Sequence, residues 1–180
     1  THAAVQDHSR SFDADAHYAL ARRAAAESTV LLKNEDDLLP LAAGTKVAVI
    51  GDFAETPRYQ GAGSSAVNSI KVDSLLGCWG ESGLEQVGFA AGFNRQGKPD
   101  AAKQAEAVAL AQKADVVLLC MGLDEIKESE GLDRSDMCVA ANQIELLRAL
   151  QKVNPNIVVV LSAGASVETS WANHCKALVY

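Results

Sequence analysis

The sequence predicts an α/β fold: a doubly wound, mostly parallel sheet of five to six strands with helices on both faces, a three-layer α/β/α sandwich. Continuous apolar, β-branched runs at 46–51, 116–121 and 157–161 are typical of strands buried on both faces. Segments of helical periodicity alternate with these runs, which is the pattern of a parallel sheet. With 180 residues, 48% of them hydrophobic, the chain is long and apolar enough to form one such core.

The first third of the chain predicts a helix, two strands and a long loop. Asp13 is placed to cap a helix that reaches Ser28, since an aspartate accepts hydrogen bonds from the first free N–H groups of a helix. The following residues predict a strand at 30–32 and a turn at 34–37, and Pro40 ends this segment. The buried strand at 46–51 comes next. The polar loop over 52–74 is long enough to suggest a function.

The remaining elements alternate between helix and strand. A short helix is expected to begin at 74–76 and to stop at Gly77 and Gly80, before a strand at 86–90. Helical periodicity predicts two longer helices at 99–114 and 142–153, the second with Ile144, Leu147, Leu150 and Gln151 directed inward. Beyond the strand at 157–161, the sequence predicts a helical turn at 171–173 and a last strand at 177–180.

Composition excludes several kinds of function. The net charge is −7 and no cluster of lysines and arginines occurs, which argues against a nucleic-acid partner or an anionic membrane. No apolar run approaches the roughly 20 residues of a membrane span. The histidines are scattered and the cysteines show no metal spacing, so we expect no metal and no cofactor. The sequence specifies no cellular compartment.

Two common motifs are absent. The strand at 46–51 resembles the first strand of a dinucleotide-binding fold, but no GxGxxG follows it, and Gly61-Ala62-Gly63 comes too late. That glycine-rich segment is either a structural turn or a loop that contacts a ligand. The segment Ser162-Ala163-Gly164-Ala165-Ser166 lacks the GxSxG pattern of a serine hydrolase.

A cluster of carboxylates follows the strand at 116–121. Glu128, Glu130 and Asp133 lie in the loop at its carboxyl end, the edge at which open α/β sheets bind ligands. Gly131 allows a sharp bend that would direct Glu130 inward, and Arg134 is placed to pair with Asp133. The residues alone leave two interpretations open: a solvated acidic loop, or a carboxyl group that gives and takes protons.

Four blocks of sequence, in the same order, resemble the second domain of glycoside hydrolase family 3, which contains β-glucosidases, β-xylosidases and N-acetylglucosaminidases. The blocks span nearly the whole chain: 22–34 with Leu38-Leu39-Pro40-Leu41; 47–51 with 58–65; Glu130-Gly131-Leu132-Asp133-Arg134 with Gln143, Leu146 and Leu147; and 157–165. One departure is Met137-Cys138-Val139-Ala140, which stands where the family pattern usually has Leu and Pro.

The resemblance implies a retaining β-glycosidase. In that family an aspartate on a preceding (β/α)₈-like domain is the nucleophile, and a glutamate on the α/β domain is the acid/base. A retaining mechanism requires the two carboxyl groups to stand roughly 5 to 5.5 Å apart across the sugar. The resemblance assigns the acid/base role to Glu130, with Glu128 as its rival.

Other site residues follow from the same resemblance. Arg58 and Ser64 are expected to contact the carbohydrate substrate, and Asp133 and Arg134 to support the loop. The alternative for Arg58 and the loop 61–65 is that they border the site or contact the other domain. The leading hypothesis is therefore the acid/base domain of a β-glucosidase. The alternatives are xylosidase or N-acetylglucosaminidase specificity, a sugar-binding or scaffold domain without turnover, and, more remotely, a nucleotide-binding module.

The ends of the chain predict that it is a piece of a longer polypeptide. It begins with Thr1 rather than Met and stops inside the apolar run 176–180. We expect residues 1–12 to be a linker from the missing (β/α)₈-like domain, and residues 13–180 to be the sandwich domain, truncated at its C-terminus. Because the nucleophile would lie on the missing domain, the fragment alone is expected to be inactive.

Overall fold

The computed structural model describes residues 12–180, which fall into a first unit that ends at Val30 and a second made of Leu31–Tyr180. The first unit contains α2 (Ala14–Ser28). The side chain of Asp13 caps this helix by accepting a hydrogen bond from Ala16 N–H at 3.0 Å, as predicted. The predicted linker, apart from Phe12, lies outside the described residues, and the extent of the domain stays a prediction.

The second unit is built on a six-stranded sheet with the order β1-β6-β5-β4-β2-β3. Its pairs are parallel except for β1, which runs antiparallel to β6. This confirms the predicted mostly parallel sheet. The strands are β1 (Leu31–Asn34), β2 (Lys46–Ile50), β3 (Glu85–Ala90), β4 (Val116–Gly122), β5 (Ile157–Ser162) and β6 (Ala177–Val179).

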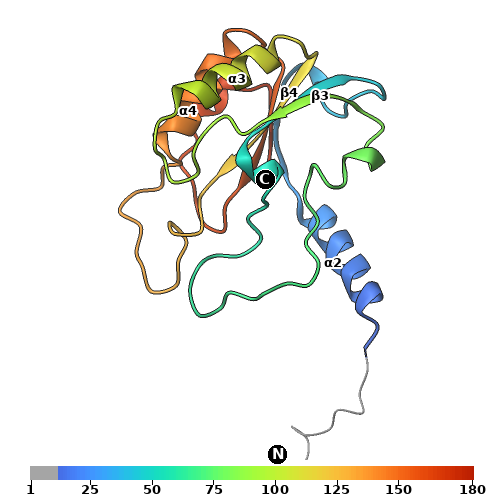
Figure 1. Cartoon of the computed structure of the whole chain (residues 1–180), viewed down its shortest axis with the longest axis vertical. Helices are drawn as coiled ribbons and strands as arrows, with labels where there is room; N and C mark the ends of the chain where they lie inside the picture. The colour runs from blue at the N-terminus through green and yellow to red at the C-terminus, as the bar shows by residue number, and fades with distance from the viewer. Residues whose placement is uncertain (1–11) are drawn as a thin grey trace, which may run out of the picture. The chain divides into compact units, whose positions relative to one another are not determined.

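The second unit has two α-helices, α3 (Ala101–Ala111) and α4 (Ala141–Gln151), which contact each other (Figure 1). Four short 3₁₀ segments complete it: η1 (Glu35–Asp37), η2 (Asp52–Ala54), η3 (Trp79–Glu81) and η4 (Ser170–His174). The segment η4 confirms the helical turn predicted there. The helix predicted to begin at 74–76 was wrong, because residues 75–78 form a single turn, closed by hydrogen bonds from Gly77 and Cys78 N–H to Ser74.

The core lies between the sheet and the helices and connections that pack against it. The central strands β2, β4 and β5 are almost wholly buried, which explains their continuous apolar sequences. Helix α4 directs four residues of one helical face inward: Gln143, Leu146, Leu147 and Leu150. The prediction was therefore wrong for Gln151, which is exposed; the helix buries the polar Gln143 instead.

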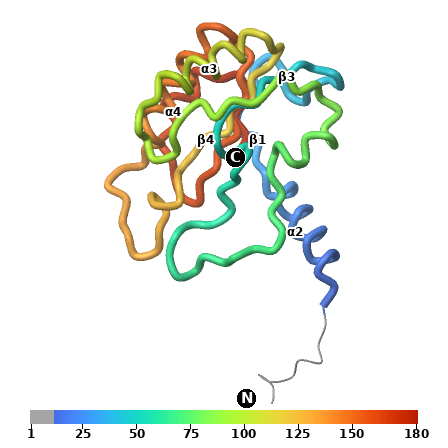
Figure 2. Tube along the Cα trace, viewed as in Figure 1, coloured from blue at the N-terminus to red at the C-terminus, as the bar shows by residue number. Residues whose placement is uncertain are grey.

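The order of the strands determines where a site can form. From β2 the chain moves outward to the edge strand β3, then returns past β2 to β4, β5 and β6. The point at which this direction reverses lies between β2 and β4, and ligands bind there outside the carboxyl ends of the strands. The long connections after β2 and β4 both leave from this end of the sheet (Figure 2).

Candidate active site

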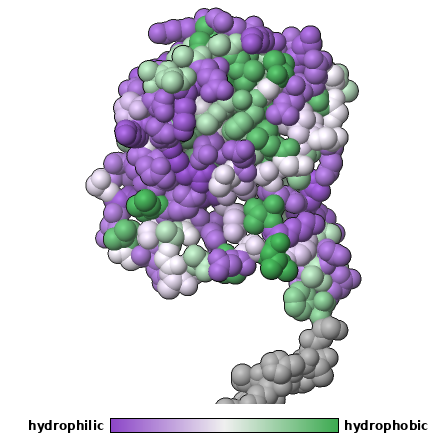
Figure 3. Space-filling view, in the orientation of Figure 1, coloured by the Kyte–Doolittle hydropathy of each residue, from purple (hydrophilic) through white to green (hydrophobic). Residues whose placement is uncertain are grey.

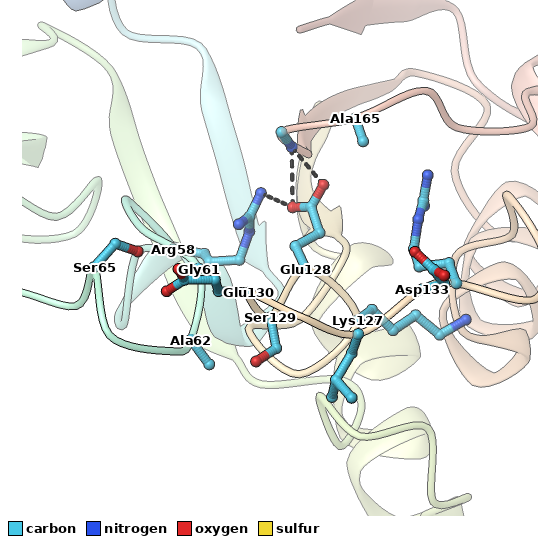
Figure 4. Close-up of a pocket in the computed structure, with 13 residues that line it drawn as sticks. Arg58, Gly61, Ala62, Ser65, Lys127, Glu128, Ser129, Glu130, Asp133 and Ala165 are labelled. Carbon is cyan, nitrogen blue, oxygen red and sulfur yellow. Dashed lines mark hydrogen bonds and ion pairs between the residues drawn. The ribbon is translucent and has the colours of Figure 1, made fainter.

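A pocket of about 480 Å³ opens at this reversal point, between the connections that follow β2, β4 and β5 (Figure 4). Five residues singled out from the sequence line it: Arg58, Glu128, Glu130, Asp133 and Arg134. The remaining lining residues are mainly small or polar: Gly61, Ala62, Ser65, Lys127, Ser129, Leu132, Gly164 and Ala165. The fold therefore gathers the predicted site residues around one depression.

Glu128 lies deep in this pocket and is held from two sides (Figure 4). Its carboxylate forms an ion pair with Arg58, and the two side chains are only 10% and 7% exposed. Both carboxylate oxygens also accept the N–H of Gly164, at 2.9 and 3.0 Å. Glu128 therefore joins the connections after β2, β4 and β5, and Arg58 is directed to Glu128 rather than into the open part of the pocket.

Glu130 has a different environment. Its side chain is exposed, and its Oε2 accepts hydrogen bonds from both the hydroxyl and the backbone N–H of Ser64, the latter at 3.0 Å. These bonds stabilise the carboxylate, so they lower the pKa of Glu130; the Ser64 hydroxyl has the larger effect and the Ser64 N–H the smaller. Ser64, predicted to contact the substrate, has its hydroxyl on Glu130, and a substrate contact by Arg58 or Ser64 stays a prediction.

The glycine-rich loop packs directly against the acidic loop. Ala62 N–H donates to Glu125 O at 3.2 Å, and Glu130 N–H donates to Ala62 O at 3.0 Å. Gly63 has a φ of +119°, and a Cβ at this position would lie 2.7 Å from Glu130 Cβ. Only glycine fits here. These contacts give the loop a structural role; it also borders the pocket, and contact with a ligand stays a prediction.

Two details of the acidic loop differ from prediction. Gly131 does make a sharp bend, with a φ of +78°, but the bend leaves Glu130 exposed, and Glu128 is the inward carboxylate. Arg134 does not pair with Asp133 in the described part of the chain. Its guanidinium instead donates to Ser166 O at 2.8 Å, so Arg134 ties the acidic loop to the connection after β5.

Sequence reasoning missed a second buried arginine beside the site. Arg95 is 8% exposed and donates from Nε to Asp52 at 2.6 Å. It also pairs with Glu125, donates to Thr56 O, and lies 4.3 Å from the centre of the Phe53 ring. Arg95 therefore fastens the connections after β2, β3 and β4 together. No local pattern indicates this, since Arg95 stands alone in a polar segment.

Neither a metal site nor a membrane span occurs in residues 12–180. They contain no group of three or more His, Cys, Asp or Glu side chains that could hold a metal ion. No helix of this part of the chain has the length and hydrophobicity needed to cross a bilayer.

Comparison with known proteins gives a consistent result. Residues 29–180 match the glycosyl hydrolase family 3 C-terminal domain. An exo-α-(1→6)-L-arabinopyranosidase of Bifidobacterium breve is 45% identical over 190 residues, which cover 99% of this chain and 25% of the relative. The thermostable β-glucosidase B of Acetivibrio thermocellus is 41% identical, over 93% of this chain and 23% of its own length.

The fold agrees with solved structures of such enzymes. The crystal structure of the family 3 β-glucosidase of Bifidobacterium adolescentis superposes with a TM-score of 0.91 and 47% identity, over 100% of this chain and 27% of that one. The chain thus spans about a quarter of the length of the relatives that it matches. It belongs to glycoside hydrolase family 3 and corresponds to the C-terminal domain of that family.

Proposed function

We propose that this domain supplies the acid/base carboxyl group of a retaining β-glycosidase, and that Glu130 is that group. The aspartate nucleophile would lie on another domain of the same polypeptide. The observation that carries the proposal is the pocket itself, which places Glu130 at the reversal point of the sheet.

The environments of the two glutamates favour Glu130 over Glu128. Both oxygens of Glu128 accept the N–H of Gly164, and one of them also pairs with Arg58. Both oxygens of this carboxylate therefore already have partners within the domain. Glu130 is exposed beside the pocket, and both hydrogen bonds that it accepts from Ser64 fall on one oxygen, Oε2. An acid/base must reach the glycosidic oxygen and then a water molecule, which requires an exposed carboxyl group.

The reaction needs Glu130 in both protonation states. As acid, it protonates the leaving oxygen while the nucleophile attacks the anomeric carbon; as base, it removes a proton from the water that hydrolyses the glycosyl-enzyme. The hydrogen bonds from Ser64 favour the carboxylate, which suits the second step. For the first step, the charge of the nucleophile and burial by its domain would raise the pKa of Glu130.

Exposed apolar side chains support a covering domain. Hydrophobic residues interrupt the hydrophilic surface over the two long connections beside the pocket (Figure 3). The exposed large apolar residues of these connections are Tyr59, Val67, Ile70, Val72, Ile126, Leu132 and Met137. A group of this kind marks an interaction surface, and the relatives are about four times as long as this chain. We therefore expect the isolated domain to be inactive.

For substrate, we propose terminal β-linked glucosides. The similarity to a family 3 β-glucosidase of 47% identity and to the thermostable β-glucosidase B supports this choice. The similarity to the arabinopyranosidase supports the competing specificity. Values of kcat/KM for the p-nitrophenyl β-D-glucoside, α-L-arabinopyranoside and β-D-xyloside, measured on the full-length enzyme, decide between them; a larger value for either of the last two would overturn the proposal.

Azide rescue in the full-length enzyme tests the acid/base assignment. With an activated aryl β-glucoside the leaving group needs little acid, so Glu130→Ala mainly slows deglycosylation. Azide then occupies the space left by the carboxyl group and attacks the intermediate. We expect rescue of Glu130→Ala with a glycosyl azide product. Rescue of Glu128→Ala alone would move the role to Glu128, and full activity of both variants would remove the mechanism from this loop.

A further inference from the structure

The Arg58–Glu128 pair has no chemical part in the proposed reaction, yet it is the most deeply placed pair of charges in the pocket. Both side chains are at least nine-tenths buried. Nε of Arg58 is buried and has no hydrogen-bond partner among residues 12–180, so the pairing with Glu128 is the main compensation for this charge. Burying two charges for packing alone is unfavourable compared with burying apolar groups of the same size, which suggests that the pair serves the site.

The Arg58–Glu128 pair lies where it can fix the position of Glu130. Glu128 stands two residues before Glu130 and is fixed to the connection after β2 by Arg58, and to the connection after β5 by Gly164 N–H. Glu130 itself is fixed to the connection after β2 by Ser64 and by Ala62 O. The acidic loop is therefore anchored at Glu130 itself and two residues before it.

The pair also balances charge beside Glu130. Six charged residues line the pocket: Arg58, Lys127, Glu128, Glu130, Asp133 and Arg134. Lys127 Nζ lies 3.1 Å from Cys138 O and 3.5 Å from Asp136, and Arg134 donates to Ser166 O. Asp133 is exposed. Among these groups, Arg58 and Glu128 are the two that are buried and paired with each other, so their opposite charges partly offset one another at Glu130 as long as both are present.

We propose that Arg58 and Glu128 are a positioning pair for the acid/base: they anchor the loop that carries Glu130 and present it with a balanced charge. This inference rests on the proposed function. Its consequence is that removing one member leaves an uncompensated charge whose sign depends on the member removed. Glu128→Gln leaves the Arg58 cation, which favours the Glu130 carboxylate; Arg58→Gln leaves the Glu128 anion, which favours the protonated form.

The test is the pH dependence of kcat/KM in the full-length enzyme with an alkyl β-glucoside, whose poor leaving group needs the acid. The alkaline limb of kcat/KM follows the loss of the proton from the acid in the free enzyme, and so reports the pKa of that acid. We expect Glu128→Gln to move this limb to lower pH and Arg58→Gln to move it to higher pH, each by about one unit. The double variant restores its position, and Arg58→Lys, which keeps the charge, leaves it in place.

A purely structural role gives a different result. The inference is overturned if the single variants lose activity or thermal stability while the alkaline limb of kcat/KM stays in place. It is also overturned if the limb moves in the same direction in both variants. Glu128→Gln is nearly isosteric and keeps an oxygen for Gly164 N–H, so it decides the question even where Arg58→Gln does not fold. Azide rescue of Glu130→Ala, measured in parallel, separates failure of this inference from failure of the acid/base assignment.

Discussion

Ser64 and Glu130 lie 66 positions apart in the chain, and yet one carboxylate oxygen of Glu130 receives both the hydroxyl and the backbone N–H of Ser64. The contact joins the connections after β2 and β4 across the reversal point of the sheet. It fixes the side chain that we propose as the acid/base, and it also sets the proton affinity of that side chain.

Replacing Ser64 with alanine is expected to raise the pKa of Glu130, because the hydroxyl is the largest of the effects that lower it. A carbon-detected NMR titration of the isolated domain measures this directly. Ser65→Ala is the matched control, since Ser65 acts on Glu130 through its backbone N–H, which alanine retains. Equal titration midpoints in the Ser64→Ala variant and the unsubstituted domain would show that the hydroxyl has no such effect.

The same contact predicts how stability depends on pH. The pKa of Glu130 is lower in the folded state than its ordinary value, so the contact stabilises the folded domain at pH values above the unfolded pKa. This contribution is lost as the pH falls through the folded pKa. In Ser64→Ala the fall in the free energy of unfolding on acidification is therefore expected to be smaller. Urea titrations between neutral and acid pH measure the difference, and parallel curves for the two proteins would contradict it.

Gln143 is expected to be essential for stability. It is fully buried, its Oε1 accepts Gly122 N–H at 2.9 Å, and its Nε2 donates to Gly122 O at 3.0 Å. Gln143→Ala leaves both backbone groups at the end of β4 unpaired, so the free energy of unfolding is expected to fall by about 2–4 kcal/mol in urea denaturation. The control is Gln151→Ala on the exposed side of the same helix, with an expected change within about 0.5 kcal/mol.

The sequence predicts the central strands well because nearly all of their residues are buried, whichever face they point to. It predicts the edge that carries the site, since the loops after parallel strands meet there. It does not predict the partners within that edge. Arg58 reaches Glu128, and Arg134 reaches Ser166 rather than its neighbour Asp133, because these contacts depend on how separate loops pack. Burial of Gln143 depends likewise on the backbone groups of Gly122, which no helical periodicity reveals.

The cysteines should differ sharply in reactivity. Burial raises the pKa of the Cys120 thiol to about 12, so the thiol stays protonated at pH 8. Burial also keeps reagents away from it. Cys138 is exposed on the connection after β4. A thiol reagent followed by mass spectrometry is expected to modify Cys138 within the time in which Cys120 remains unmodified. Simultaneous modification of both residues in the native protein would show that the core around β4 opens more readily than its packing implies.

Arg95 is expected to be the most sensitive charged residue outside the pocket. Arg95→Met removes a buried guanidinium that pairs with Asp52 and Glu125 and donates to Thr56 O. Two carboxylates then remain close together without their cation, so we expect the free energy of unfolding to fall by about 3–5 kcal/mol.

The matched control is Arg23→Met in α2. The pair of Arg23 with Glu27, at 3.5 Å, is more than two-thirds exposed on both sides, and its loss is expected to cost no more than about 0.5 kcal/mol. Urea denaturation of both variants gives the two values. Similar small losses would mean that Asp52 and Glu125 are solvated well enough without Arg95. Arg95 stands on the connection after β3 and contacts Asp52 on the connection after β2 and Glu125 on the connection after β4. A large loss of stability for Arg95→Met alone therefore shows that this one side chain fastens the three connections to one another.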